Sequence, residues 1–321
     1  MDTGSHLLLG MSLAGLAYAD PVVALHPEIA HAVIIGTVIG SVAPDFDTLV
    51  RLRGYAFYIR HHRGISHSIP ALFLWPAVIS GSIILCSELS HGWFSLFLWT
   101  LAAVVLHVGL DMCNTYGVQS LRPFSKAWVH LDILSIFEPF LFFLHLAGIV
   151  AWWLHVGIAP GVLFGWIYVI SGLYIVIRVR QHRALIRLIK AHSNKKGQCH
   201  VFPQLSWFRW QYLLEGEQAF YTGIIERGRI MSGEVFSKQE KNDVIQATVG
   251  TDGVRAFLAF AQRVHVTCLE LQDGYHVRWS DVRFWHGQKL PFGVDVRLDR
   301  ELNVISCSLG WRKKVWEPPF V

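Results

Sequence analysis

The stretch RHHRGISHSIPALFLWPAVISGSIILCS, Arg60–Ser87, joins a polar segment directly to a long apolar one. Its first nine residues hold three histidines, two arginines and two serines. Residues 68–87 carry no charge and match the roughly 20 apolar residues that cross a bilayer as a helix. The stretch therefore predicts a membrane helix with a cluster of ionisable side chains at its N-terminal end.

Five further apolar segments accompany this one within the first 180 residues. They cover residues 6–19, 29–44, 93–113, 133–156 and 161–179. The segments from residue 68 onward are long enough to span a bilayer, and the first two are shorter. The sequence predicts a mainly α fold, a polytopic membrane bundle of about six apolar helices over residues 1–180.

The composition supports a membrane protein. Hydrophobic residues make up 53% of the 321 residues and charged residues 16%, whereas soluble domains carry roughly 25% charged residues. The net charge of +5 gathers beside apolar segments, which indicates membrane orientation and no nucleic-acid partner. The five cysteines form no CxxC pair, so neither a zinc finger nor a disulfide framework is predicted.

Basic residues alternate between the connections of the predicted bundle. Residues 45–67, 114–132 and 180–197 contain Lys or Arg, whereas residues 20–28, 88–92 and 157–160 contain none. With six crossings all the basic connections fall on one side, which the positive-inside rule assigns to the cytoplasm. We predict a multi-pass protein of a bacterial inner membrane, with both termini facing the cytoplasm.

The chain changes character after the apolar segments. Residues 181–197 form a basic amphipathic linker, in which Leu185, Ile186, Leu188 and Ile189 would face lipid; a plain charged linker is the alternative. Residues 198–321 show alternating patterns in VHVTCLEL, YHVRWSDVRFW and VDVRLDRELNVISCSLGW, the last typical of a hairpin around Asp299–Asn303. They predict a small soluble antiparallel β or α+β domain that binds a protein partner or covers the site.

Ionisable side chains recur at one end of the predicted helices. In an up-and-down bundle they share the cytoplasmic face, and they are His6, Asp45, Asp47, His62, His67, His107 and Asp111. Neutral His nitrogens and Asp oxygens suit zinc, manganese or iron. His107 and Asp111 stand four apart and share one helix face. The alternatives are a buried structural pair for His107 and Asp111, and a solvated turn for Asp45 and Asp47.

The side chains of the polar stretch, residues 60–68, suit different chemical roles. Arg63 offers a bidentate fork for a phosphate or carboxylate, next to a glycine that permits close approach. His62 and His67 suit a ligand and a base, whereas Arg60 and His61 suit anionic lipid heads, the alternative for the whole loop. Ser66 or Ser68 can cap the helix that follows.

The ordered series His6, PDFD (44–47), HRGISHS (62–68), HVGLD (107–111), NTYG (114–117) and PFS (123–125) resembles the family of LexA-regulated, inner-membrane-bound metal-dependent hydrolases. The resemblance covers roughly residues 1–180 and implies a metal site at the seven His and Asp side chains named above. A fainter likeness is to zinc-dependent phospholipase C. This sequence lacks that family's later His-x-x-x-Glu pair and its N-terminal Trp, so we expect one or two metal ions and not a three-zinc site.

Two functions from different classes follow. The first is a metal-dependent hydrolase of a phosphoester or a lipid-like phosphorylated substrate, with zinc first and manganese or iron as alternatives. Its predicted catalytic residues are His62, Arg63 and Asp47, its metal ligands His6, Asp45, Asp47, His67, His107 and Asp111, and its substrate-binding residues Arg63, Asn114, Tyr116 and Asp132. The second is a non-enzymatic membrane regulator with a structural metal. A transporter fits less well, because its polar groups would lie near the bilayer midplane.

Overall fold

The computed structural model describes residues 1–87, 89–193, 195–238 and 242–312 and divides into two compact units. The first unit contains Met1–Asp47 and Arg63–His182. The second contains Thr48–His62 together with the chain from Arg183 onward. The segment between Asp47 and Arg63 therefore groups with the C-terminal unit, although both of its flanking residues belong to the first.

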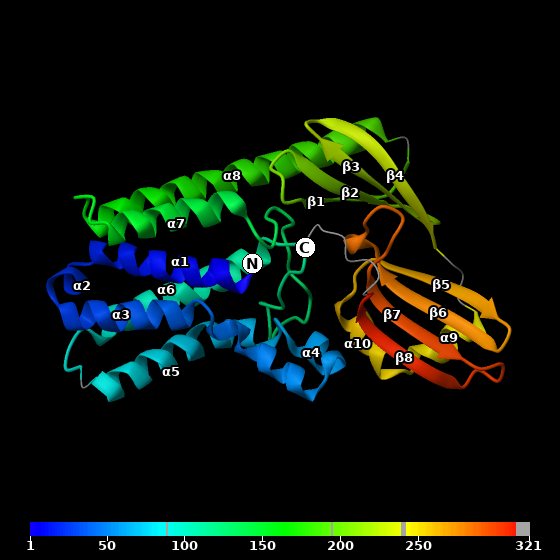
Figure 1. The fold of residues 1–321 in the computed structure, drawn as a ribbon, viewed down its shortest axis with the longest axis horizontal. Helices are drawn as coiled ribbons and strands as arrows, with labels where there is room; N and C mark the ends of the chain where they lie inside the picture. Colours follow the sequence, from blue (N-terminus) through cyan, green and yellow to red (C-terminus); the bar gives the residue numbers. More distant parts are fainter. Residues whose placement is uncertain (88, 194, 239–241, 313–321) are drawn as a thin grey trace. The chain divides into compact units, whose positions relative to one another are not determined.

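The N-terminal part of the chain is helical (Figure 1). Its elements are α1 (Thr3–Leu16), η1 (Ala17–Ala19), α2 (Pro21–Leu25), α3 (Pro27–Gly40), η2 (Ala43–Arg53), α4 (Tyr55–His61), η3 (Ile65–His67), α5 (Ile69–Ser87), α6 (Trp93–Met112), α7 (Pro139–Trp153) and α8 (Pro160–His192). Asp2 and Asp20 cap α1 and α2 by accepting backbone N–H groups, which is the usual role of Asp at this position.

Helix α3 lies inside the bundle and contacts α1, α5 and α6. Small residues allow close contacts here: a Cβ atom at Gly36 would lie 2.4 Å from Oγ1 of Thr100 in α6. Such small-residue contacts let apolar helices approach closely where lipid provides no hydrophobic drive. A second link joins α1, α7 and α8, because His145 lies 2.6 Å from the Ser12 hydroxyl and 3.0 Å from that of Ser171.

Among the residues that the structure describes, three helices are long and apolar enough to cross a membrane, namely α5, α6 and α8. The pair α3 and η2, bent by 42°, would raise the number to four. The prediction of about six spanning helices is therefore wrong. In the predicted segment 133–156 only the 15 residues of α7 are helical, because Glu138 and Pro139 begin the helix there. Fifteen residues extend about 22 Å, short of a hydrocarbon core of about 30 Å.

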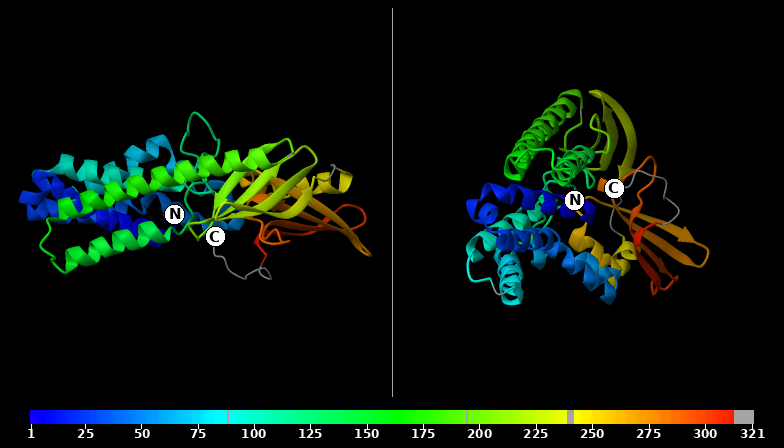
Figure 2. Two further views of the ribbon diagram at one scale, coloured as in Figure 1. Left: turned by 90° about the horizontal axis from the view of Figure 1, so that it is seen from above. Right: turned by 60° about the vertical axis from the view of Figure 1, so that its left-hand side comes forward.

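The C-terminal unit contains two antiparallel sheets (Figure 2). The first sheet has the order β1 (Gln198–Pro203), β2 (Arg209–Glu215), β3 (Ala219–Glu226) and β4 (Arg229–Ser237). The second has the order β5 (Val264–Leu271), β6 (Gly274–Asp281), β7 (Phe292–Leu298) and β8 (Val304–Trp311). Between them come α9 (Asp243–Val249) and α10 (Asp252–Phe260), which pack on the second sheet, and η4 (Val282–Phe284) follows β6.

The prediction of a C-terminal domain of antiparallel strands is confirmed. Strand β5 coincides with VHVTCLEL, and β7 and β8 form the hairpin expected around Asp299–Asn303. The predicted strand YHVRWSDVRFW ends early, at Asp281. There the Asp281 carboxylate accepts the backbone N–H of Arg283 and starts the short helix η4.

Helix α8 continues to His192 and meets the first sheet. Ile189 is 2% exposed and packs with strand residues such as Val201 and Trp210, while Leu185 and Ile186 border the same cluster. The prediction that these side chains face lipid is therefore wrong. The apolar side of the helix end packs against the apolar face of β1 and β2 and is therefore not in contact with lipid.

Candidate metal centre

Four side chains from three segments converge in the first unit. Asp45 comes from η2, His67 from η3, and His107 and Asp111 from successive turns of α6. One ligand atom from each lies within 4.8 Å of every other. The side chains of His67, His107 and Asp111 are fully buried, and that of Asp45 is 16% exposed. The cluster therefore opens on the Asp45 side.

The separations within the cluster leave room for an ion. Oδ1 of Asp45 lies 3.6 Å from Nε2 of both His67 and His107, and Nε2 of His107 lies 3.7 Å from Oδ2 of Asp111. Direct hydrogen bonds would be about 2.7–3.2 Å long. The edges of a tetrahedron of zinc ligands measure about 3.3 Å, given bonds of about 2.0–2.1 Å.

Two buried carboxylate oxygens in the cluster have no hydrogen-bond partner among the described residues, Oδ1 of Asp45 and Oδ2 of Asp111. Arg63 Nη2 lies 3.1 Å from the latter as an ion pair. Leaving a buried carboxylate oxygen without a donor costs free energy. A divalent cation among the four side chains would satisfy both oxygens, so the residues present fit a transition-metal ion.

Neighbouring groups orient both histidines. Nδ1 of His107 lies 2.7 Å from the Ser41 carbonyl oxygen, which can only accept, so Nδ1 carries the proton and Nε2 presents a lone pair to the cluster. Nδ1 of His67 lies 2.9 Å from the Ser66 hydroxyl and 3.8 Å from Oδ2 of Asp47. Such partners on the second ring nitrogen are typical of metal-bound histidines.

The charges of the cluster attract a cation. Burial by itself disfavours the charged form of His67, but hydrogen bonds to Asp111 and Asp45 outweigh it and raise the pKa of His67. The same two carboxylates would favour a metal ion in place of that proton.

His6 and Asp47 lie beside the four converging side chains. The His6 ring stacks on His107 with centroids 3.8 Å apart, and its Nε2 lies 3.2 Å from Oδ1 of Asp111. Oδ2 of Asp47 accepts the backbone N–H of Arg63 at 2.9 Å and also contacts the Ser66 hydroxyl. Asp47 thereby fixes the turn that carries Arg63, which has a φ of 59°. The same Oδ2 lies 3.8 Å from Nδ1 of His67, the ring nitrogen that does not face the cluster.

Arg63, Asn114 and Tyr116 form one group at the rim of the cluster. Nη1 of Arg63 donates to Oδ1 of Asn114 at 3.3 Å, and its guanidinium lies 5.8 Å from the Tyr116 ring centre. Nδ2 of Asn114 donates to Oδ1 of Asp111 at 3.3 Å. The motif NTYG therefore supports Arg63 and Asp111 together.

Asp132 and His62, two further predicted site residues, also have partners outside the four-residue cluster. Asp132 pairs with His130, whose Nδ1 lies 2.9 Å from its Oδ1. His62 caps the C-terminal end of α4 and stacks on Tyr58 with ring centroids 4.6 Å apart, in the segment that groups with the C-terminal unit.

Sequence reasoning missed the groups that orient the histidines. The contact with the Ser41 carbonyl could not be predicted from residue types, because every residue has a backbone carbonyl. Ser66 was considered as a helix cap, yet its hydroxyl contacts Asp47 and His67 instead. The one sequence feature that could have indicated this contact is that Ser66 directly precedes His67.

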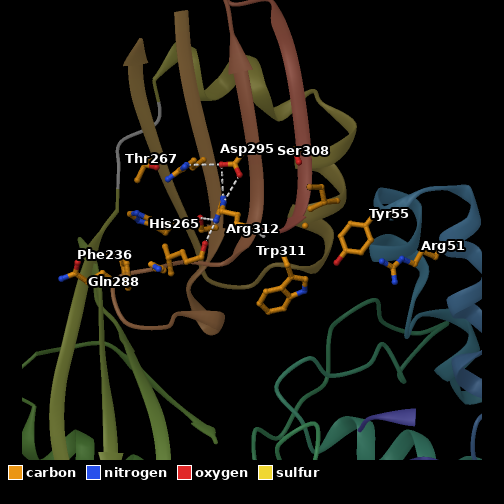
Figure 3. Close-up of a pocket in the computed structure, with 16 residues that line it drawn as sticks. Arg51, Tyr55, Phe236, His265, Thr267, Gln288, Asp295, Ser308, Trp311 and Arg312 are labelled. Carbon is orange, nitrogen blue, oxygen red and sulfur yellow. Dashed lines mark hydrogen bonds and ion pairs between the residues drawn. The ribbon is translucent and has the colours of Figure 1, made fainter. Parts of the chain in front are cut away.

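The C-terminal unit has a pocket of its own, of about 1120 Å³, on the second sheet (Figure 3). Among its lining residues, Asp295 pairs with Arg278 at 3.2 Å and with Arg312 at 2.9 Å. The pocket lining includes several basic side chains, and no cluster of His, Cys, Asp or Glu suited to a metal is found there among the described residues.

Comparisons with known proteins give two family matches and one curated relative. Residues 1–185 match the model of the YdjM inner membrane protein, and residues 243–316 match the YfhP C-terminal alpha/beta plait domain. The uncharacterized protein YfhP of Bacillus subtilis (strain 168) is 37% identical over 317 residues, which cover 97% of this chain and 95% of the relative. No solved structure matches.

Proposed function

The chain belongs to the YdjM inner membrane protein family, and from this membership together with the buried His/Asp cluster we propose that it is a membrane-bound, metal-dependent hydrolase. One observation carries the proposal: Oδ1 of Asp45, without a hydrogen-bond partner among the described residues, and Oδ2 of Asp111, paired with Arg63, both border the space between Nε2 of His67 and Nε2 of His107. A bound zinc, manganese or iron ion would activate water and polarise a phosphoryl or acyl oxygen there.

Arg63 binds the anionic group of the substrate in this proposal. Its guanidinium lies beside Asp111, Asn114 and Tyr116, and its Nε has no hydrogen-bond partner among the described residues. An Arg fork recognises phosphate by charge-assisted hydrogen bonds. Because the cluster opens on the side of the partly exposed Asp45, the substrate approaches from that side.

Asp47 serves as a positioning residue in this proposal. Its Oδ2 accepts hydrogen bonds from the Arg63 N–H and the Ser66 hydroxyl. It holds His67 and Arg63 in place, whereas His62 remains the predicted general base.

The substrate class follows from the location. Ionisable groups at the ends of apolar helices suit a phosphoester with an apolar tail, such as a membrane lipid. The Lys and Arg of residues 45–67 and 114–132, which flank the site, would face the cytoplasm by the positive-inside rule. We further propose that the C-terminal unit binds a protein partner.

A non-enzymatic regulator is the second candidate, and the ligand number favours it. Structural zinc sites use four protein ligands, whereas catalytic sites leave one position open. Four side chains converge here, three of them fully buried. In the regulator the ion would stabilise the bundle, and the C-terminal unit would carry the interaction.

Metal content and hydrolysis measured on the same preparations separate the two candidates. The purified protein should contain one or two equivalents of zinc, manganese or iron and hydrolyse members of a phosphoester and phospholipid panel. Protein with a full complement of metal and no turnover on the panel would favour the regulator. Protein that binds none of these metals contradicts both.

A further inference from the structure

A second group of metal-ligating side chains lies at the opposite end of the helices from the first. His26 occupies the N-cap position of α3, Glu28 lies in the first turn of that helix, and His91 directly precedes Gly92 at the start of α6. Their ligand atoms lie within 4.8 Å of one another. Because His91 stands just before α6 and Asp111 lies near its C-terminal end, roughly 27 Å of helix separates the two groups.

The distances in this group match those of the central cluster. Oε1 of Glu28 lies 3.6 Å from Nδ1 of His26 and 3.5 Å from Nε2 of His91. Both separations exceed a hydrogen bond of about 2.7–3.2 Å and approach the edge of about 3.3 Å between ligands of one zinc ion. Two histidine nitrogens and one carboxylate oxygen thus surround a common point.

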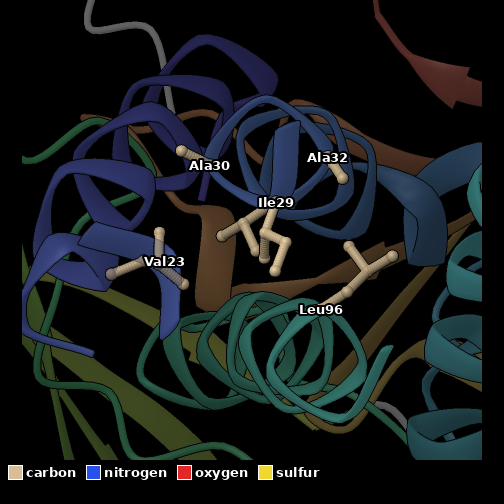
Figure 4. Packing of buried hydrophobic residues seen from close by; sticks show 7 residues of the cluster. Val23, Ile29, Ala30, Ala32 and Leu96 are labelled. Carbon is tan, nitrogen blue, oxygen red and sulfur yellow. The ribbon is translucent and has the colours of Figure 1, made fainter. Parts of the chain in front are cut away.

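The surrounding structure holds these residues in place. Ile29, next to Glu28, is fully buried in a cluster with Val23 and Leu96, which come from the chain just before His26 and just after His91 (Figure 4). Gly92 has a φ of 74°, and a Cβ there would lie 2.3 Å from Cδ1 of Ile29. One core cluster therefore fixes both chain segments that carry the three ligands.

The hydrogen bond of His91 leaves its Nε2 available to bind a metal ion. Nδ1 of His91 lies 3.2 Å from the Ser90 hydroxyl, which orients the ring and directs Nε2 toward Glu28. No Lys or Arg occurs in residues 20–28 or 88–92, so no side-chain cation of these segments competes for the Glu28 carboxylate. The three side chains are 44–52% exposed, so water can complete the coordination.

We infer that His26, Glu28 and His91 form a second binding site for a divalent transition-metal ion such as zinc. Two neutral histidines and one carboxylate are the ligand set of open three-ligand zinc sites. This site is independent of the proposed hydrolase, since it shares no residue with the central cluster. Its exposure predicts that a chelator removes its ion before the central one.

The test measures zinc binding to the full-length protein in detergent by equilibrium dialysis and elemental analysis. The background is the double variant Asp45→Asn/His107→Ala, which removes two central ligands. It should bind one equivalent of Zn²⁺, and adding His91→Ala or Glu28→Gln should abolish this binding. His31→Ala, an exposed histidine one turn further along α3, is the matched control and should retain the equivalent.

The outcomes for the two sites are distinguishable. Glu28→Gln alone should remove one equivalent from the otherwise unchanged protein and leave the central ion and any hydrolysis intact. The second site is refuted if the double variant binds no Zn²⁺, or if its bound Zn²⁺ survives both His91→Ala and Glu28→Gln. Because Glu28→Gln preserves size and shape at an exposed position, loss of the fold would not obscure the result.

Discussion

The Nε2 atoms of His67 and His107 face each other at 3.3 Å. The proton of His107 lies on its other nitrogen, against the Ser41 carbonyl, so its Nε2 presents a lone pair. The Nδ1 of His67 approaches Ser66 and the Asp47 carboxylate, which favours a proton on that nitrogen as well. Without a metal ion, a second proton on His67, which its two carboxylate neighbours favour, lies between the two nitrogens. A metal ion bordered by Asp45 and Asp111 can take the place of that proton.

Replacing a ligand of the central cluster should remove its metal. Asp45→Asn keeps the shape but loses the charge, and His107→Ala loses an Nε2 lone pair, so each should lower the metal content of the purified protein by at least one equivalent. Elemental analysis after dialysis measures the loss. His145→Ala is the matched control: it removes a buried histidine that contacts Ser12 and Ser171, and metal content should stay unchanged.

Asp47→Asn should weaken metal binding without abolishing it. The carboxylate orients His67 and the Arg63 turn from outside the four ligands, and loss of such a partner typically costs about 10–100-fold in metal affinity. Competition with a chelator of known affinity measures the change. A loss as complete as that in Asp45→Asn would instead identify Asp47 as a direct ligand.

Arg63→Lys should separate substrate binding from metal binding. Lysine keeps the charge but cannot form the planar fork, and a lost charge-assisted hydrogen bond is worth about 1.5–3 kcal/mol. We expect kcat/KM on an active phosphoester to fall by at least about tenfold, with metal content unchanged. Unchanged kcat/KM would exclude Arg63 from substrate recognition.

The sequence predicted the composition of the cluster more closely than its arrangement. Residue type and position near helix ends singled out Asp45, His67, His107 and Asp111 because few other residues in apolar surroundings can bind a metal. Whether His6 and Asp47 bind directly depends on ring and carboxylate orientations, which are set by partners such as Ser66 and a backbone carbonyl. Hydropathy does not encode those contacts.

Helix lengths and partners were harder to predict for a related reason. Hydropathy treats residues 133–156 as one apolar segment, but Glu138 and Pro139 start the helix inside it. The stripe around Ile189 is equally compatible with lipid and with a sheet. Only the fold shows that strands β1 and β2 cover it.

Ile189→Ala tests that contact. Because the side chain is 2% exposed in a core cluster with Val201 and Trp210, truncation should destabilise the packing of α8 on the first sheet by about 2–5 kcal/mol. The amides of β1 and β2 should then exchange faster with deuterium, measured by mass spectrometry on the full chain in detergent. Arg187→Ala, an exposed neighbour on the same helix, should leave exchange unchanged. Equal exchange in Ile189→Ala and the unaltered protein would mean that this side chain faces lipid or detergent after all.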